Sequence, residues 1–109
     1  MNYPQELSIA VKTIKEVLNN AEIPVMNIYL FGSRARGDFS QNSDWDFLVC
    51  CKIEVPFIQK AVLAGTIQTF LAEKNISADI IFKTEDKIRE EKDNVGVITY
   101  YALKDGIPV

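Results

Sequence analysis

The sequence predicts a small α/β (α+β) domain in which a short mixed β-sheet is flanked by helices. Two observations concern periodicity: some segments carry apolar residues at helical spacing, and three short apolar runs have the composition of strands. A third is the composition, because 109 residues with 48% hydrophobic and 25% charged side chains are typical of one globular unit. We therefore expect residues 1–109 to form a single domain.

The first expected helix spans Pro4 to Asn20, where apolar residues recur at the i, i+3, i+4, i+7 spacing and lysines and glutamates occupy the other face. Pro24 interrupts this pattern. Residues 25–31 (VMNIYLF) then form a short apolar run that ends at Gly32. A run of that length fits a buried strand better than a second helix.

Residues 44–53 (DWDFLVCCKI) are rich in aromatic and β-branched residues and predict a second strand. The helix after it is expected from Pro56 to Lys74, with Gly65 marking a point of close packing. Its broad apolar face comprises Phe57, Ile58, Ala61, Val62, Ile67, Phe70 and Leu71.

Residues 77–83 (SADIIFK) predict a third strand, and Thr84 after it is the expected N-cap of a helix that begins with two acidic residues. A final helical region is expected before Gly106 and Pro108 close the chain. Its apolar positions are Ile88, Val95, Ile98, Tyr101 and Ala102.

The composition excludes several classes of function. The chain has no histidine, so any metal here is expected to be a hard cation held by carboxylates. A formal net charge of −3 gives no support to nucleic-acid binding. The adjacent Cys50 and Cys51 provide no disulfide framework, and no apolar stretch is long enough to span a bilayer. We therefore expect a cytoplasmic protein without a membrane partner.

Residues 32–46, GSRARGDFSQNSDWD, are the most informative stretch of the chain. Asp44 and Asp46 are two residues apart, a spacing that places both carboxylates on one face of a strand. Two neighbouring carboxylates repel each other, and a bound Mg²⁺ is a common way to keep both ionised. Asp44 and Asp46 are therefore predicted metal ligands.

The other end of the same stretch predicts a phosphate site. Gly32 and Ser33 directly follow a strand, where a glycine allows close approach of a ligand and the next amides can face an anion. Arg34 and Arg36 would add cationic hydrogen-bond donors. Together with the metal ligands, these residues predict a site for a nucleoside triphosphate.

Asp79 is a third acidic candidate, because it lies within the otherwise apolar run SADII. A buried carboxylate is costly unless it is paired or binds a metal. The alternative is that this strand lies at an edge of the sheet and faces water.

The stretch from Gly32 to Asp46 resembles the signature of the nucleotidyltransferase superfamily related to DNA polymerase β: Gly-Ser, ten residues, then Asp-x-Asp. The resemblance implies a minimal nucleotidyltransferase fold. It also implies that Asp44 and Asp46 hold two Mg²⁺ ions and that Asp79 completes the metal site or activates the acceptor hydroxyl. ATP is the expected substrate, and the implied nucleotide-binding residues are Gly32, Ser33, Arg34, Arg36 and Ser43.

The expected reaction is transfer of a nucleoside monophosphate, most simply AMP, to a hydroxyl. A chain of 109 residues leaves no room for an acceptor-binding domain, so the acceptor is expected to come from a partner. Small nucleotidyltransferases of this size are similar to the antitoxins of two-component modules whose toxin is a helical HEPN-type ribonuclease. The resemblance therefore implies AMP transfer to a tyrosine of such a toxin. Two alternatives stay open: a catalytically silent antitoxin, and a small-molecule nucleotidyltransferase.

Overall fold

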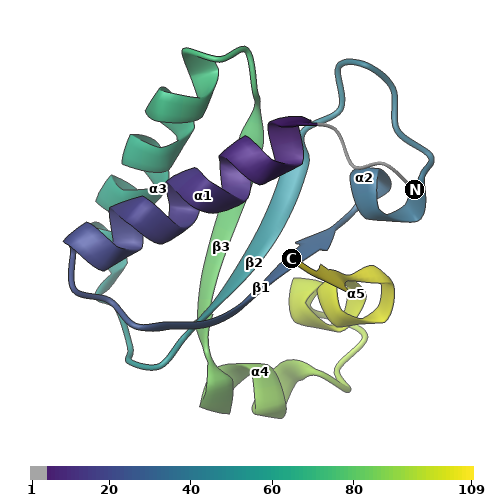
Figure 1. The fold of residues 1–109 in the computed structure, drawn as a ribbon. Helices are drawn as coiled ribbons and strands as arrows, with labels where there is room; N and C mark the ends of the chain where they lie inside the picture. Colours follow the sequence, from purple (N-terminus) through teal and green to yellow (C-terminus); the bar gives the residue numbers. More distant parts are fainter. Residues whose placement is uncertain (1–4) are drawn as a thin grey trace.

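The computed structural model describes residues 5–109 and contains a four-stranded mixed sheet with helices on both sides of it (Figure 1). In chain order the elements are α1 (Gln5–Asn20), β1 (Val25–Phe31), α2 (Ser33–Arg36), β2 (Trp45–Cys51), α3 (Phe57–Ala72), β3 (Ala78–Thr84), α4 (Glu85–Glu91), α5 (Ile98–Asp105) and β4 (Ile107–Pro108). The predicted start of the first helix at Pro4 lies outside the described residues. The predicted fold class is confirmed.

The strand order is β3-β2-β1-β4. β1 runs antiparallel to both β2 and β4, whereas β2 and β3 are parallel and are joined through α3. Because β1 ends where β2 and β3 begin, residues from all three strands meet at one end of the sheet. Residues 32–44, which contain α2 and a polar loop, connect β1 to β2 at that end (Figure 1).

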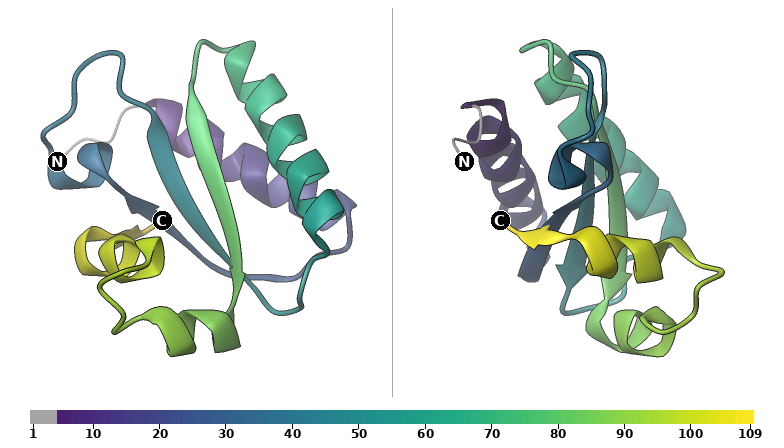
Figure 2. Two further views of the ribbon diagram at one scale, coloured as in Figure 1. Left: turned by 180° about the vertical axis from the view of Figure 1, so that it is seen from behind. Right: turned by 90° about the vertical axis from the view of Figure 1, so that its right-hand side faces the viewer.

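Alternation along the central strand β2 divides the core between the two faces of the sheet. Trp45, Phe47 and Val49 belong to the main core, which α1 and α3 cover. Leu48 points to the other face and packs with Phe31 and Ala102 under α5. Figure 2 shows from two further sides how α1, α3 and α5 surround the strands. Asp46 has the parity of Leu48, so its side chain belongs to the α5 face.

The predicted apolar face of α3 packs only in part. Ile67 and Leu71 are buried, as expected, and Leu63 joins them. The other five residues predicted for this face are exposed: Phe57, Ile58, Ala61, Val62 and Phe70. The predicted broad apolar face of α3 is therefore buried only in part, because α3 packs against β3 and α1 on one side of the helix.

The final helical region differs from its prediction. Thr84 is the expected N-cap, and its hydroxyl accepts a hydrogen bond from the Lys87 amide at 3.1 Å. The helix nevertheless ends at Glu91, and a turn that contains the exposed Val95 separates α4 from α5. The last residues form the edge strand β4, which is too short for a sequence pattern to reveal.

A half-buried carboxylate ties these last elements to the sheet. Glu91 Oε1 lies 3.0 Å from Lys83 Nζ and accepts a hydrogen bond from Thr99 Oγ1 at 2.8 Å. Burial is the largest single influence and raises the pKa of Glu91, but the hydrogen bonds from Lys83 and Thr99 and the charges of Lys83 and Lys87 together lower it by more, so the net shift is downward. Among residues 5–109, no helix combines the length and the apolar character that crossing a bilayer requires.

Candidate active site

Two of the three predicted acidic residues are direct neighbours across strands. Asp46 is the register partner of Phe31 on β1 and of Asp79 on β3. Partners in adjacent strands point to the same face of a sheet and are about 5 Å apart. The structure therefore brings the carboxylates of Asp46 and Asp79 together, directly beside the end of β1.

Asp44 lies just before β2 and is exposed. Its Oδ1 accepts a hydrogen bond from the Ser77 hydroxyl at 2.6 Å, the length typical of a bond to an ionised carboxylate. Ser77 directly precedes β3, so this bond joins the two segments that carry the aspartates. Ser77 is a site residue that the sequence pattern did not predict. Its position two residues before Asp79 was the available signal.

Asp46 is half-buried, and its pKa is raised above the ordinary value of 3.8. Burial is the largest cause, followed by the negative charges of Asp79 and Asp44, while Arg36 opposes the shift. The site thus holds more negative charge than its own cation balances. Such a site favours an incoming cation.

The prediction that Asp79 is buried is wrong. Asp79 is exposed, because β3 is an edge strand of the sheet. The edge-strand alternative therefore describes its surroundings correctly. Exposure makes the Asp79 carboxylate accessible to a ligand. Its negative charge still contributes to the raised pKa of Asp46.

At Gly32 the backbone lies directly against the side chain of Asp46. Its φ is +75°, in the region that L-amino acids rarely adopt, and a Cβ there would overlap Asp46 Oδ2. Its carbonyl oxygen accepts hydrogen bonds from the amides of Ala35 and Arg36, which starts α2. The first amides of a helix have no acceptor within the helix, so Ser33 begins a segment with donors to offer.

We expect Gly32→Ala to lower the free energy of unfolding by about 2–4 kcal/mol and to impair any activity that needs Asp46. Gly37→Ala is a matched control, because Gly37 also has a positive φ, +91°, but a Cβ there would meet nothing within 4 Å. The control should lose only the backbone cost of about 1 kcal/mol. Urea unfolding of both variants measures the difference, and equal losses would show that the contact with Asp46 is unimportant.

The sequence suggests that Arg34 is an exposed side chain that binds phosphate, but the structure places it in a different environment. Its side chain is buried, with the guanidinium 4.5 Å from the ring centroids of both Phe39 and Trp45. Nε and Nη2 donate hydrogen bonds of 3.0–3.3 Å to the carbonyl oxygens of Gln41 and Ser43. Arg34 therefore holds the loop between α2 and β2, and sequence spacing gave no sign of this aromatic clamp.

The remaining predicted residues lie around the same loop. Arg36 is exposed and pairs with Asp38 at 3.2 Å and with Asp105 at 3.7 Å. Ser43 accepts a hydrogen bond from the Ser40 amide at 2.9 Å through its hydroxyl, which closes the turn before Asp44. Arg36 thus supplies positive charge beside the acidic cluster, and Ser43 shapes the loop that leads to it.

The donor set suits Mg²⁺ bound together with a substrate. Within residues 5–109, no three acidic or thiol side chains lie close enough to form a ready-made metal cage. Mg²⁺ commonly uses one or two carboxylates and completes its shell with water and phosphate oxygens. The pair formed by Asp46 and Asp79, with Asp44 beside it, fits that mode of binding.

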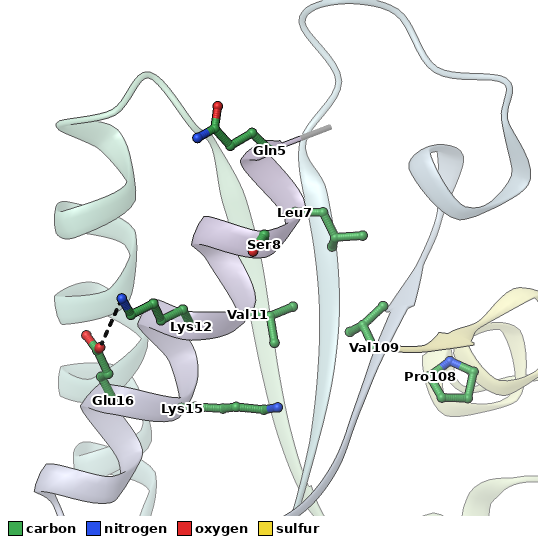
Figure 3. Close-up of a pocket in the computed structure, with 9 residues that line it drawn as sticks. All are labelled: Gln5, Leu7, Ser8, Val11, Lys12, Lys15, Glu16, Pro108 and Val109. Carbon is green, nitrogen blue, oxygen red and sulfur yellow. Dashed lines mark ion pairs between the residues drawn. The ribbon is translucent and has the colours of Figure 1, made fainter. Parts of the chain in front are cut away.

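Two hollows show where ligands have room. A groove of about 630 Å³ runs between α1 and β4, and Figure 3 shows Leu7, Val11 and Val109 along it. None of the predicted site residues lines this groove, so it is separate from the acidic cluster. A second hollow of about 470 Å³ borders Asp79 and Ser77 at the end of α3. Neither Asp44 nor Asp46 lines this second hollow, so it offers space for a ligand on the Asp79 side of the acidic cluster.

Comparison with known protein families shows to which family this fold and its acidic cluster belong. Residues 12–107 match the model of the family described as "Polymerase beta, Nucleotidyltransferase". The chain belongs to this family. The match spans both ends of the GS-x10-DxD stretch and all four strands up to Ile107, so it covers the fold and the acidic cluster of this nucleotidyltransferase.

Solved structures support the same fold for this nucleotidyltransferase. It is similar to a chain of a toxin-antitoxin complex crystallised with AMP-PNP, with a TM-score of 0.62 and 23% identity over 89% of this chain and 69% of that chain. It is also similar to a chain of the MntA-HepT toxin-antitoxin complex, with a TM-score of 0.59 and 20% identity over 93% of this chain and 69% of that one. No curated protein matches the sequence.

Proposed function

We propose that this protein transfers AMP from ATP to a hydroxyl group, and that the acceptor is a tyrosine of a HEPN-type toxin, which makes the protein an antitoxin. The observation that carries the proposal is the register of Asp46 with Asp79 beside Gly32. It brings the predicted metal ligands to the predicted phosphate-binding turn. We expect the reaction to take place in the cytoplasm.

In the proposed reaction, the acceptor oxygen forms a bond to the α-phosphorus of ATP, and the bond from that phosphorus to the pyrophosphate oxygen breaks. Gly32 lets the triphosphate approach the backbone, and the amides that begin at Ser33 face its oxygens. Arg36, which is exposed beside Asp46, adds a positive charge for the departing pyrophosphate. The exposed carboxylate of Asp79 is placed to accept the proton of the attacking hydroxyl.

Asp44, Asp46 and Asp79 are the residues that would hold Mg²⁺ in this reaction. When bound, Mg²⁺ neutralises phosphate charge and lowers the pKa of a coordinated hydroxyl. The hydrogen bond from Ser77 orients the Asp44 carboxylate. Burial and, after it, the charges of Asp79 and Asp44 raise the pKa of Asp46, and a bound cation would relieve the repulsion among these carboxylates.

Support for the partner comes from the solved structures to which this chain is similar, because those are complexes of a toxin with an antitoxin, one of them with AMP-PNP. A tyrosine hydroxyl on a protein surface is a chemically suitable acceptor, since its pKa near 10 is within reach of activation by a metal ion.

The test is to incubate the protein with labelled ATP, Mg²⁺ and the product of the neighbouring gene as the candidate partner. We expect label on that partner and, by mass spectrometry, a mass increase of one AMP on a tyrosine peptide. The double variant Asp44→Asn with Asp46→Asn should leave the partner unlabelled. If this variant still neutralises the toxin in cells, the protein acts by binding alone and the transfer proposal fails.

A further inference from the structure

We propose that this protein forms a two-fold symmetric dimer in which the outward face of α3 packs against α3 of a second copy. This outward face consists of Ile58, Ala61, Val62, Gly65, Thr66, Thr69 and Ala72, which lie on one side of the helix by its periodicity of 3.6 residues per turn. The inference is independent of the proposed reaction. It rests on composition, exposure and the position of one glycine.

The outward face of α3 has the chemistry of a buried surface. Among the 16 residues of α3 only Lys60 is charged, and Lys60 Nζ lies 3.5 Å from Glu54, away from this face. Ile58 is 77% exposed and Val62 is 61% exposed. A helix that is apolar on all sides is normally covered on all sides. In Figure 2, none of the helices and strands within residues 5–109 lies over the outer side of α3.

The two threonines do not make this face polar. Thr66 Oγ1 donates to the carbonyl oxygen of Val62 at 2.8 Å, and Thr69 Oγ1 donates to that of Gly65 at 2.8 Å. Both hydroxyl protons are therefore used within the helix, which leaves the methyl groups as the outer contact surface. A partner can cover these residues without leaving a donor unsatisfied.

Gly65 indicates that another helix approaches this face closely. Glycine inside a helix costs about 0.5–1 kcal/mol relative to alanine. The sequence predicted close packing at Gly65, yet a Cβ there would meet no atom of this chain within 4 Å. Nothing inside the fold requires a glycine, so the requirement comes from outside it. Small residues at this spacing, Ala61, Gly65 and Thr69, let two helix backbones come together.

A second copy is the occupant that fits, because the face is complementary to itself. If two antiparallel helices cross with the two-fold axis at Gly65, Ile58 of one copy faces Ala72 of the other, and Ala61 faces Thr69. A large side chain thus meets a small one at each end. The face carries no charge, so two copies meet without like-charge repulsion although each chain has a net charge of −3.

The area is sufficient for self-association. Phe57 and Phe70, which are 82% and 51% exposed, border the face on its two sides. With Ile58 and Val62 they leave roughly 500 Å² of apolar side chain in water, at about 150–250 Å² for each complete large side chain. That lies in the upper part of the roughly 300–600 Å² range of the largest apolar patch on a typical monomer, and it is more than half of the roughly 800 Å² per partner of a standard interface.

The test measures the mass of the purified full chain by sedimentation equilibrium over a range of concentrations. We expect a monomer–dimer equilibrium with a dissociation constant on the order of 1–100 μM. Val62→Glu should raise that constant at least about 100-fold, because it buries an unpaired charge. Val95→Glu is the matched control, since Val95 is also a 62% exposed valine but lies in the turn before α5. Thermal unfolding checks that both variants fold.

Cross-linking tests the antiparallel register. An Ala61→Cys chain mixed with a Thr69→Cys chain should form a disulfide-linked pair on mild oxidation, while the native Cys50 and Cys51 are buried and should not react. Cross-links within each single variant instead would overturn the antiparallel arrangement. A wild-type chain that stays monomeric at about 500 μM overturns the dimer itself. If Val62→Glu then prevents binding of the toxin partner, the face belongs to a heteromeric interface.

Discussion

Asp46→Asn is expected to abolish nucleotidyl transfer and, at neutral pH and without metal, to make the protein more stable. The activity loss should be at least about 10³-fold, because stabilisation of phosphate charge by a bound metal is worth several kcal/mol. The stability gain follows from the raised pKa of Asp46, which burial causes first and the charges of Asp79 and Asp44 reinforce. An uncharged amide of the same shape escapes both costs.

The sign of the pH dependence follows from the same shift. A carboxyl group with a raised pKa binds its proton more tightly in the folded state, so wild-type stability falls as the pH rises from the ordinary value of 3.8 through the raised value. The stabilising effect of Asp46→Asn should therefore be present at pH 7 and disappear below about pH 4. Mg²⁺ should raise the unfolding temperature of the wild type and not of the variant.

Asp93→Asn is the control for Asp46→Asn. Asp93 is exposed in the turn after α4, so its substitution removes one negative charge far along the chain from the acidic cluster. It should change neither transfer nor the response to Mg²⁺. If Asp93→Asn stabilises the metal-free protein as much as Asp46→Asn does, the gain reflects net charge and not the crowding of carboxylates around Asp46.

Some parts of the site are predictable from local sequence spacing, whereas others depend on the order of the strands in the sheet. Gly32, Asp44 and Asp46 are predictable because a strand, a glycine and a carboxylate pair at fixed spacing leave few arrangements open. The exposure of Asp79 is not predictable, because it depends on β3 lying at the edge of the sheet, and strand order is a property of the whole fold. β4 is not predictable for the same reason, since its two residues become a strand only through pairing with Tyr29 and Leu30.

α3 shows the limit of periodicity in another way. Its apolar residues predict a helix correctly, but they surround the helix instead of forming one stripe, so they do not indicate which side faces the sheet. Only packing against β3 and α1 decides that Leu63, Ile67 and Leu71 are inside. The apolar residues that remain outside are the basis of the proposed dimer.

Arg34→Lys is expected to lower the free energy of unfolding by about 3 kcal/mol although it keeps the charge. Lysine cannot reproduce the planar group that lies between Phe39 and Trp45 while donating to two carbonyl oxygens. Loss of stacking costs about 1–2 kcal/mol, and hydrogen bonds from a charged donor contribute about 1.5–3 kcal/mol. Arg36→Lys, in the same short helix but exposed, should cost less than about 0.5 kcal/mol. Urea unfolding measures both.

The kinetics of the same variant separate two roles for Arg34. If Arg34 positions the loop that carries Asp44, then Arg34→Lys should lower kcat, because Asp44 and its bond to Ser77 are displaced together. If Arg34 instead binds the triphosphate directly, Arg34→Lys should keep normal stability and kcat and raise only the KM for ATP. The three hydrogen bonds to the loop favour the first outcome, since they leave Nε and Nη2 already engaged.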